Sequence, residues 1–161
     1  MKKIVFFLAF LLVLVFPVRI SAIQPAFSED EKALLGLDKI EAINPGTFLY
    51  PVKRLGEKIK LSLIKRKENK ASYLSLLLQK RFRETIYVDE KEKSGFFVES
   101  ANRFNTQVGQ IKSDYSGLDA KLKTQIPVYV SALEKLRDKY SSNSANWLIF
   151  QQSLDTIHQL E

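Results

Sequence analysis

Residues 97–115 read FVESANRFNTQVGQIKSDY, and this stretch decides the fold class. Its apolar side chains recur at alternating spacings of four and three residues, at Phe97, Ala101, Phe104, Val108, Ile111 and Tyr115. Because a helix completes two turns in about seven residues, this spacing places them all on one face. The stretch therefore predicts an amphipathic helix, which the polar residues Ser113 to Gly117 end.

A second apolar stripe follows immediately and consists of Leu118, Leu122, Ile126, Tyr129, Leu133, Leu136 and Tyr140. Pro127 lies within it, and a proline inside a helix removes a backbone hydrogen bond. We therefore expect either a kink there or a helix that begins afresh near Thr124. After a Ser141–Ser144 loop with N-cap residues, a last helix is indicated by Trp147, Phe150, Leu154 and Ile157. Trp147 is expected to anchor the core or an interface.

Two further helices are expected before residue 97. Pro51 suits the first turn of the first one, where a missing N–H leaves no hydrogen bond unmade. The apolar stripe of this helix consists of Val52, Leu55, Ile59 and Leu63, and the cations of residues 65–69 are expected to close it. The second helix runs from about Lys70 to Lys91, with an expected buried stripe of Leu74, Leu77, Leu78, Phe82 and Ile86.

The segment Ser28–Ile43 is expected to form a short helix. Ser28 and Glu31 match a capping box, in which each side chain accepts a hydrogen bond from the backbone N–H of the other residue. Leu34, Leu37 and Ile40 follow at helical spacing, and residues 44–47 are typical of a turn.

No segment shows the strict alternation of a strand. The sequence therefore predicts an all-α fold, an antiparallel helical bundle of four long helices plus a short N-terminal helix, preceded by a hydrophobic signal segment. We expect the apolar stripes to form an intramolecular core. Coiled-coil association with another chain is the alternative.

The N-terminus has the three-part pattern of a secretory signal peptide. A basic start precedes the apolar run Ile4–Phe16, and Ala22 is a small residue at the expected cleavage site. The run is shorter than the ~20 residues that span a bilayer, although an uncleaved membrane anchor is the alternative. The predicted divisions are a signal peptide at 1–22, a short acidic segment at 23–43 and a bundle domain at 44–161. The expected location is extracytoplasmic, in the periplasm or at the cell surface.

The composition excludes several kinds of chemistry. The 161 residues include no Cys and one His. Disulfide scaffolds, thiol catalysis and Cys-ligated metals are therefore excluded. His158 has no partner at metal-ligand spacing, and no carboxylate pair or Lys nucleophile stands out. We expect a non-enzymatic protein with no catalytic residue, metal or cofactor.

Positive charge is concentrated in one segment of the chain. Residues 53–83 contain 11 Lys and Arg against two Glu, whereas the whole chain carries +7. Such a surface attracts an anionic membrane, a cell-wall polymer or an acidic protein face. The cations of this basic face are Lys53, Arg54, Lys58, Lys60, Lys65, Arg66, Lys67 and Lys70. The alternative is a solvated helix face whose cations pair within the chain with the acidic residues of the flanking segments. Nucleic acid is not expected, because aromatic residues are not interleaved with the cations.

The basic segment begins with a recognisable motif. Residues 44–57 read NPGTFLYPVKRLGE. They resemble the opening motif of an exported bacterial family of unknown function, approximately Pro-Gly-Ser-x-Leu-Tyr-Pro-Leu-Lys-Arg-x-x-Glu. The family's next helix begins near an Ala and carries Glu-Arg-Arg-Leu-x-Glu, which Ala71 and residues 79–84 partly match, with Gln79 in place of the first Glu. The resemblance covers residues 44–115. It implies an extracytoplasmic helical domain with no established activity, sometimes attached to membrane-anchored regulatory proteins.

The motif residues also indicate a structural role. Pro51 fixes the start of its helix, and Tyr50 lies beside it. Lys53 or Arg54 is expected to reach Glu84 or Gln79 on the antiparallel partner helix. Our hypothesis is that a group of five residues locks the hairpin, namely Tyr50, Arg54, Glu57, Arg81 and Glu84. A ligand site is the alternative.

The sequence thus favours an exported, non-enzymatic binding or scaffolding module at the cell envelope, with the basic hairpin against an anionic surface. The alternative is a protein-interaction or sensory domain that pairs through the later helices, residues 97–161. The salt dependence of binding distinguishes the two hypotheses, because screening by salt weakens adhesion to a polyanion far more than it weakens a packed helix interface. The sequence makes no prediction of oligomeric state.

Overall fold

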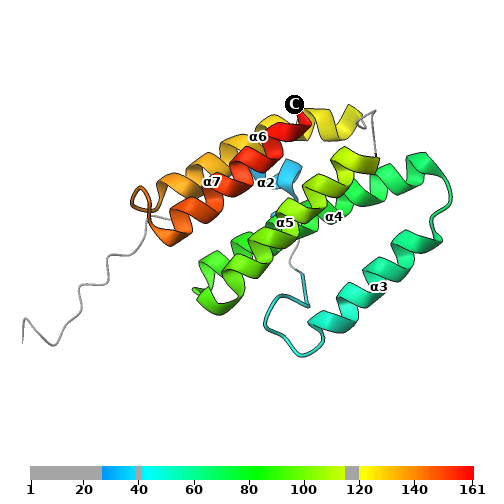
Figure 1. Cartoon of the computed structure of the whole chain (residues 1–161), viewed down its shortest axis with the longest axis horizontal. Coiled ribbons are helices and arrows are strands. Elements are labelled where there is room, and N and C mark those ends of the chain that lie inside the picture. The colour runs from blue at the N-terminus through cyan, green and yellow to red at the C-terminus, as the bar shows by residue number, and fades with distance from the viewer. Residues whose placement is uncertain (1–26, 39–40, 115–119) are drawn as a thin grey trace, which may run out of the picture.

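The computed structural model describes residues 27–38, 41–114 and 120–161 (Figure 1). Within these ranges the regular elements are α-helices and one 3-10 turn, and no strand occurs, so the all-α prediction is confirmed. In chain order they are α2 (Glu29–Leu35), α3 (Tyr50–Leu63), α4 (Lys67–Glu90), α5 (Ser94–Asp114), α6 (Ala120–Asp138), α7 (Ala145–Ile157) and η1 (His158–Leu160).

The core lies between two pairs of helices. α4 packs along α5, α6 packs along α7, and α5 joins the two pairs by packing on α7 (Figure 1). Three aromatic rings from α4, α5 and α6 meet inside, with ring centres 5.2 Å apart for Phe82 and Tyr129 and 5.7 Å for Phe82 and Phe104. Burial of these apolar surfaces supplies the main driving force for folding.

The apolar stripes of α5 and α6 are used inside the chain. The buried side chains are Phe97, Ala101, Phe104, Val108 and Ile111 on α5 and Leu122, Ile126, Tyr129, Leu133 and Leu136 on α6. The prediction of an intramolecular core is therefore confirmed for these residues. Tyr115 and Leu118 lie outside the described residues.

Pro127 does not divide its helix. α6 runs without interruption from Ala120 to Asp138, so a helix that begins afresh near Thr124 is wrong. Ile126 and Tyr129 flank the proline and are 3% and 0% exposed. Packing of these side chains on the core outweighs the one backbone hydrogen bond that the proline removes.

The N-terminal helix is shorter than predicted. The capping box is present, because Ser28 Oγ accepts from Glu31 N–H at 3.2 Å and Ser28 N–H donates to Glu31 at 2.8 Å. However, α2 ends at Leu35, because Gly36 adopts a left-handed conformation with φ 66°. The N–H of Leu37 then bonds to the carbonyl of Lys32, which closes the helix end. A helix that continues to Ile43 is therefore wrong, and Ile40 lies outside the described residues.

α3 faces the opposite way from what its apolar stripe predicts. It begins at Tyr50 with Pro51 in its first turn and packs mainly on α4. The buried face carries Tyr50 and Glu57. The apolar stripe points to solvent, with Val52, Leu55, Ile59 and Leu63 between 51% and 72% exposed. The chain leaves α3 after Leu63, and α4 begins at Lys67, three residues before the expected start at Lys70.

The C-terminal helix begins at its predicted cap. Ser144 Oγ accepts from the N–H of Trp147 at 3.3 Å. Trp147 is half-buried, and the Arg137 guanidinium lies 5.7 Å from its ring centre, so this residue lies at the margin of the core. Across the described ranges, every helix is too short or too polar to cross a bilayer. The apolar run Ile4–Phe16 and the expected cleavage site lie outside those ranges.

Candidate functional site

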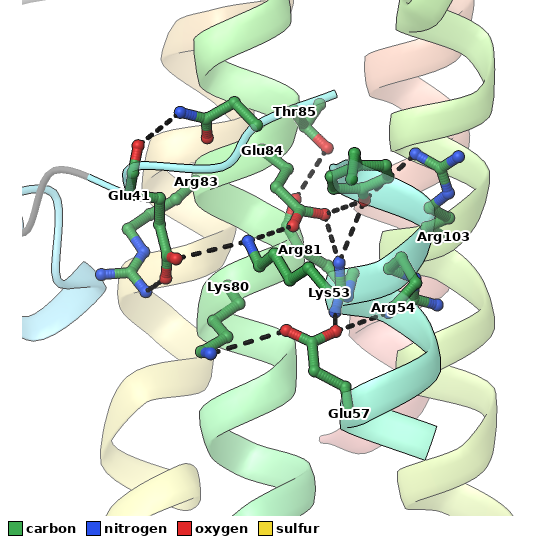
Figure 2. A network of polar contacts seen from close by, with 12 residues as sticks. Glu41, Lys53, Arg54, Glu57, Lys80, Arg81, Arg83, Glu84, Thr85 and Arg103 are labelled. Carbon is green, nitrogen blue, oxygen red and sulfur yellow. Dashed lines mark hydrogen bonds and ion pairs between the residues drawn. The ribbon is translucent and has the colours of Figure 1, made fainter. Parts of the chain in front are cut away.

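A buried network of charges joins α3 to α4 (Figure 2). Arg81 of α4 lies at its centre and is 0% exposed. Its guanidinium pairs with Glu57 of α3 and with Glu84, one turn further along α4. Both carboxylates are themselves buried. Charges can be buried in this way only when each has an opposite charge and hydrogen bonds to replace water.

Tyr50 connects the centre of the network to a third helix. Its hydroxyl donates to Glu84 at 2.6 Å and accepts from Arg81 at 3.1 Å. Arg103 of α5 donates to the same hydroxyl at 3.2 Å, and its guanidinium lies 4.8 Å from the ring centre. The tyrosine side chain is thus held by α4 and α5 together.

Further cations surround the two central carboxylates. Lys53 Nζ lies 3.0 Å from Glu84, while Arg54 and Lys80 lie 3.1 and 3.5 Å from Glu57. Figure 2 shows these side chains converging from α3 and α4 on one region. The network therefore holds more cationic than anionic groups around Glu57 and Glu84.

A second branch of the network connects α4 to the segment before α3. Glu41 pairs with Arg83 at 2.6 Å and with Lys53 at 3.3 Å. Arg83 also donates to the carbonyl of Gly36 at 3.0 Å. Arg83 of α4 thus contacts both the end of α2 and Glu41, which lies just before the motif of residues 44–57.

The titration behaviour of the central groups follows from this arrangement. Burial by itself raises the pKa of Glu84, but Arg81, the Tyr50 hydroxyl and Lys53 together bring that pKa below its ordinary value. Burial likewise lowers the pKa of Arg81, but the two carboxylates raise it overall. Burial, followed by the negative charge of Glu84, raises the pKa of Tyr50. Glu84 therefore stays ionised and Tyr50 stays protonated at neutral pH, so neither is arranged for proton transfer.

We expect Glu84 to make the stability of the protein depend on pH. Because the folded-state pKa of Glu84 lies below the unfolded-state pKa, its contribution is complete above the ordinary value of 4.5. The contribution is lost as the pH falls through the folded-state pKa. The difference in free energy of unfolding between the wild type and Glu84→Gln should therefore be largest near neutral pH and shrink on acidification. Urea unfolding between neutral pH and about pH 3 measures it.

The matched control is Glu90→Gln, which removes one carboxylate from an exposed position on the same helix. The free energy of unfolding of this variant should differ little from that of the wild type over the whole pH range. A Glu84→Gln difference that is equally large at both ends of the pH range would contradict the assignment of an ionised, paired Glu84.

The family model described as Domain of unknown function (DUF5667) matches residues 42–145, which is more than half of the chain. The chain belongs to this family. No curated protein and no solved structure matches the chain. The DUF5667 match is longer than the motif resemblance over residues 44–115, and it includes the whole of α3, α4, α5 and α6. Apart from Glu41, the network residues lie within the DUF5667 domain.

The structure brings together all five residues of the hairpin hypothesis, Tyr50, Arg54, Glu57, Arg81 and Glu84. It also adds residues that sequence reasoning missed. Lys80 and Arg103, together with the Glu41–Arg83 pair, belong to the same network. Arg103 lies 53 positions from Tyr50 in the chain, and no local spacing relates the two. Gln79 makes no ion pair here; its side chain donates to the carbonyl of Leu34 at 2.9 Å.

The cations of the predicted basic face do not all lie on the surface of the DUF5667 domain, because some of them belong to this network. Lys53 and Arg54 point inward to Glu84 and Glu57, so their placement on a solvent-facing basic surface is not what the structure shows. Lys70 is half-buried and pairs with Asp114 at 3.1 Å. The remaining members are exposed, and they are Lys58, Lys60, Lys65, Arg66 and Lys67.

α3 borders hollows on the side of α4 and on the side of α5. One, of about 740 Å³, lies where α3 meets α4, and its lining includes Lys60, Lys65 and Arg66. The other, of about 400 Å³, lies between α3 and α5, and its lining includes Tyr50 and Arg103. Glu57 and Glu84 line neither hollow. In residues 27–38, 41–114 and 120–161, no group of three His, Asp or Glu side chains is placed to hold a metal ion.

Proposed function

We propose that this protein is an exported, non-enzymatic helical module of the cell envelope that binds an anionic surface through the outward cations of α3 and of the α3–α4 corner. The expectation of export rests on the N-terminal signal pattern of residues 1–22. The DUF5667 domain then supplies the rigid scaffold on which the cations are presented.

One observation carries the proposal. Lys58, Lys60, Lys65 and Arg66 are exposed, and within the described ranges none of them pairs with a carboxylate. Lys60 instead lies 4.9 Å from the centre of the Tyr73 ring. The four cations fall within nine consecutive residues of a helix end and a short connection. They are therefore concentrated enough to attract a polyanion together.

The cations that point into the buried network differ from the exposed ones, and this difference supports the same interpretation. The two buried carboxylates of the α3–α4 network, Glu57 and Glu84, are already paired with the cations Lys53, Arg54, Lys80 and Arg81. The four exposed cations Lys58, Lys60, Lys65 and Arg66 are thus not needed to neutralise these buried carboxylates. A surplus charge on a surface has its effect on partners rather than on the fold.

The absence of an enzymatic role is also part of the proposal. The buried carboxylates closest to a catalytic pair are Glu57 and Glu84, which share Arg81. A general acid or base has to reach substrate in an open site. These two groups are instead occupied by cations and line neither of the described hollows.

The test is binding by the chain that begins at Ile23, the expected secreted form, which contains all the described contacts. It is mixed with a polyphosphate resin and with phosphatidylcholine vesicles with or without phosphatidylglycerol, at low and physiological salt. Replacing Lys58, Lys60, Lys65 and Arg66 by Gln should weaken binding to the anionic probes by roughly two to three orders of magnitude at low salt, at about 1 kcal/mol per cation. Binding by the wild type should also fall as salt rises.

The matched control removes the same charge elsewhere. Lys91, Lys112, Lys121 and Lys123 are exposed on other parts of the chain, and their replacement by Gln should leave most of the affinity. Wild-type protein that binds neither resin nor vesicles at low salt would contradict the proposal. Such a result would favour the alternative, a protein partner for residues 97–161.

A further inference from the structure

More than half of the large apolar side chains that are exposed among the described residues lie on α3 or just before it. Val52, Leu55, Ile59 and Leu63 are 65%, 58%, 51% and 72% exposed, and Phe48 just before the helix is 94% exposed. Soluble proteins rarely leave such a contiguous row of large apolar side chains in water without a use for it. Figure 1 shows α3 at the edge of the molecule, away from α6 and α7, so no other helix of the described ranges covers this row.

The cations of α3 flank this row in a specific way. At about 3.6 residues per turn, the apolar row lies opposite the buried face that carries Tyr50 and Glu57. By the same geometry Lys58 lies on one side of Ile59 and Lys60 on the other. The outward half of α3 is therefore an apolar stripe with a lysine along each margin.

The C-terminal end of the stripe continues into a hollow that suits an anionic head group. This hollow of about 740 Å³ is lined by the three cations Lys60, Lys65 and Arg66. Apolar side chains line it as well, among them Leu63 and Leu76, and Leu76 is 41% exposed. A phosphate group with acyl chains beside it presents the same combination of negative charge and apolar surface.

We propose that α3 is a membrane-interface helix that lies flat on a bilayer of anionic phospholipid. The stripe of Val52, Leu55, Ile59 and Leu63 enters the boundary between head groups and acyl chains. Lys58 and Lys60 extend from the margins to the phosphates, and Lys65 and Arg66 bind a head group at the end of the helix. This inference rests on the proposed function and names the anionic surface.

The charges favour a membrane over a second copy of the chain. Two copies that met through this stripe would bring the cations around one α3 close to those around the other. Like charges held close together at a desolvated contact are destabilising. An anionic bilayer neutralises them and accepts the apolar stripe at the same time.

The buried network gives the stripe its orientation. Arg81 and Glu84 of α4 attract the polar face of α3, where Lys53 and Glu57 lie, and so turn the apolar face outward. The helix is thus preorganised as an exposed amphipathic surface and does not need to unfold from the core before it binds. Preorganisation of this kind removes the ordering cost from the binding step.

The decisive variant is Leu55→Ser/Ile59→Ser in the chain that begins at Ile23. Both side chains are more than half exposed, so the fold should be unchanged, as circular dichroism and urea unfolding check. Binding to phosphatidylglycerol-containing vesicles should weaken by at least about tenfold, because less apolar area enters the interface. Retention on the polyphosphate resin should stay the same, because the cations are intact.

The matched control is Val98→Ser/Leu148→Ser, which removes apolar side chains of similar exposure from α5 and α7. It should leave vesicle binding unchanged. A second measurement places a reporter in the stripe: Leu55→Trp in a Trp147→Phe background. Its emission should shift to shorter wavelength on anionic vesicles and be quenched by brominated phospholipid, whereas Leu148→Trp in the same background should do neither.

The outcomes separate this inference from the proposed function. Vesicle binding that survives Leu55→Ser/Ile59→Ser, or no emission shift for Leu55→Trp, would overturn the inference and leave adhesion by charge alone. Retention of the wild type on polyphosphate without vesicle binding would also overturn it and favour a polymer. An oligomer that the double serine variant dissociates, without lipid binding, would assign the stripe to a second copy. Failure of the wild type to bind either the polyphosphate resin or the anionic vesicles would contradict both this inference and the proposed function.

Discussion

Arg81→Met should lower the free energy of unfolding by about 3 kcal/mol, the lower part of the range for broken buried ion pairs. The substitution keeps most of the side-chain volume, so the loss is electrostatic. It leaves Glu57 and Glu84 buried without the guanidinium that both of them contact. Lys53, Lys80 and Arg54 remain near the carboxylates and limit the effect. Urea unfolding at neutral pH measures it.

Arg54→Met is the matched control for this prediction. The Arg54 side chain is 26% exposed and, among the carboxylates of the described ranges, pairs with Glu57 alone. Its replacement should cost less than about 1 kcal/mol. If Arg81→Met unfolded at the same urea concentration as the wild type but abolished binding to anionic probes, the network would be a ligand site rather than a structural lock.

Phe82→Ala should cost about 3–5 kcal/mol of unfolding free energy, as is typical when a buried phenyl ring is removed. Phe82 is 0% exposed. Its ring lies 5.2 Å from Tyr129 and 5.7 Å from Phe104, so its loss opens a cavity where α4, α5 and α6 meet. Thermal and urea unfolding of the folded variant measure the loss.

The same substitution at an exposed ring provides the comparison. Phe48 is 94% exposed, and Phe48→Ala should change the unfolding free energy by no more than about 0.5 kcal/mol. Equal effects of Phe82→Ala and Phe48→Ala would place the core elsewhere than between these two pairs of helices.

Much of the bundle could be predicted because its core helices follow simple rules. In α5 and α6, the spacing of residues such as Phe104 and Leu133 places the apolar groups on one face, and that face is buried. Caps are local as well, since Ser28 and Ser144 bond to N–H groups three residues further on. Gly36 ends α2 by a local rule too, although its left-handed conformation was not foreseen.

The candidate site was foreseen only in part, because its parts come from distant segments. The family-like motif drew attention to Tyr50, Arg54 and Glu57, and antiparallel pairing related them to Arg81 and Glu84. Arg103 and the Glu41–Arg83 pair depend on how α5 and the segment before α3 pack on α4. No spacing within a single helix encodes such a contact.

By itself, the sequence determined the all-α class, the positions of the main helices and the amphipathic character of α3. Only the tertiary structure decided which face of α3 is buried. An apolar stripe normally faces the core. Here α4 presents Arg81 and Glu84 to α3, and these buried charges need charged partners to replace lost water. Glu57 and Lys53 therefore turn inward, and the stripe from Val52 to Leu63 is left facing solvent.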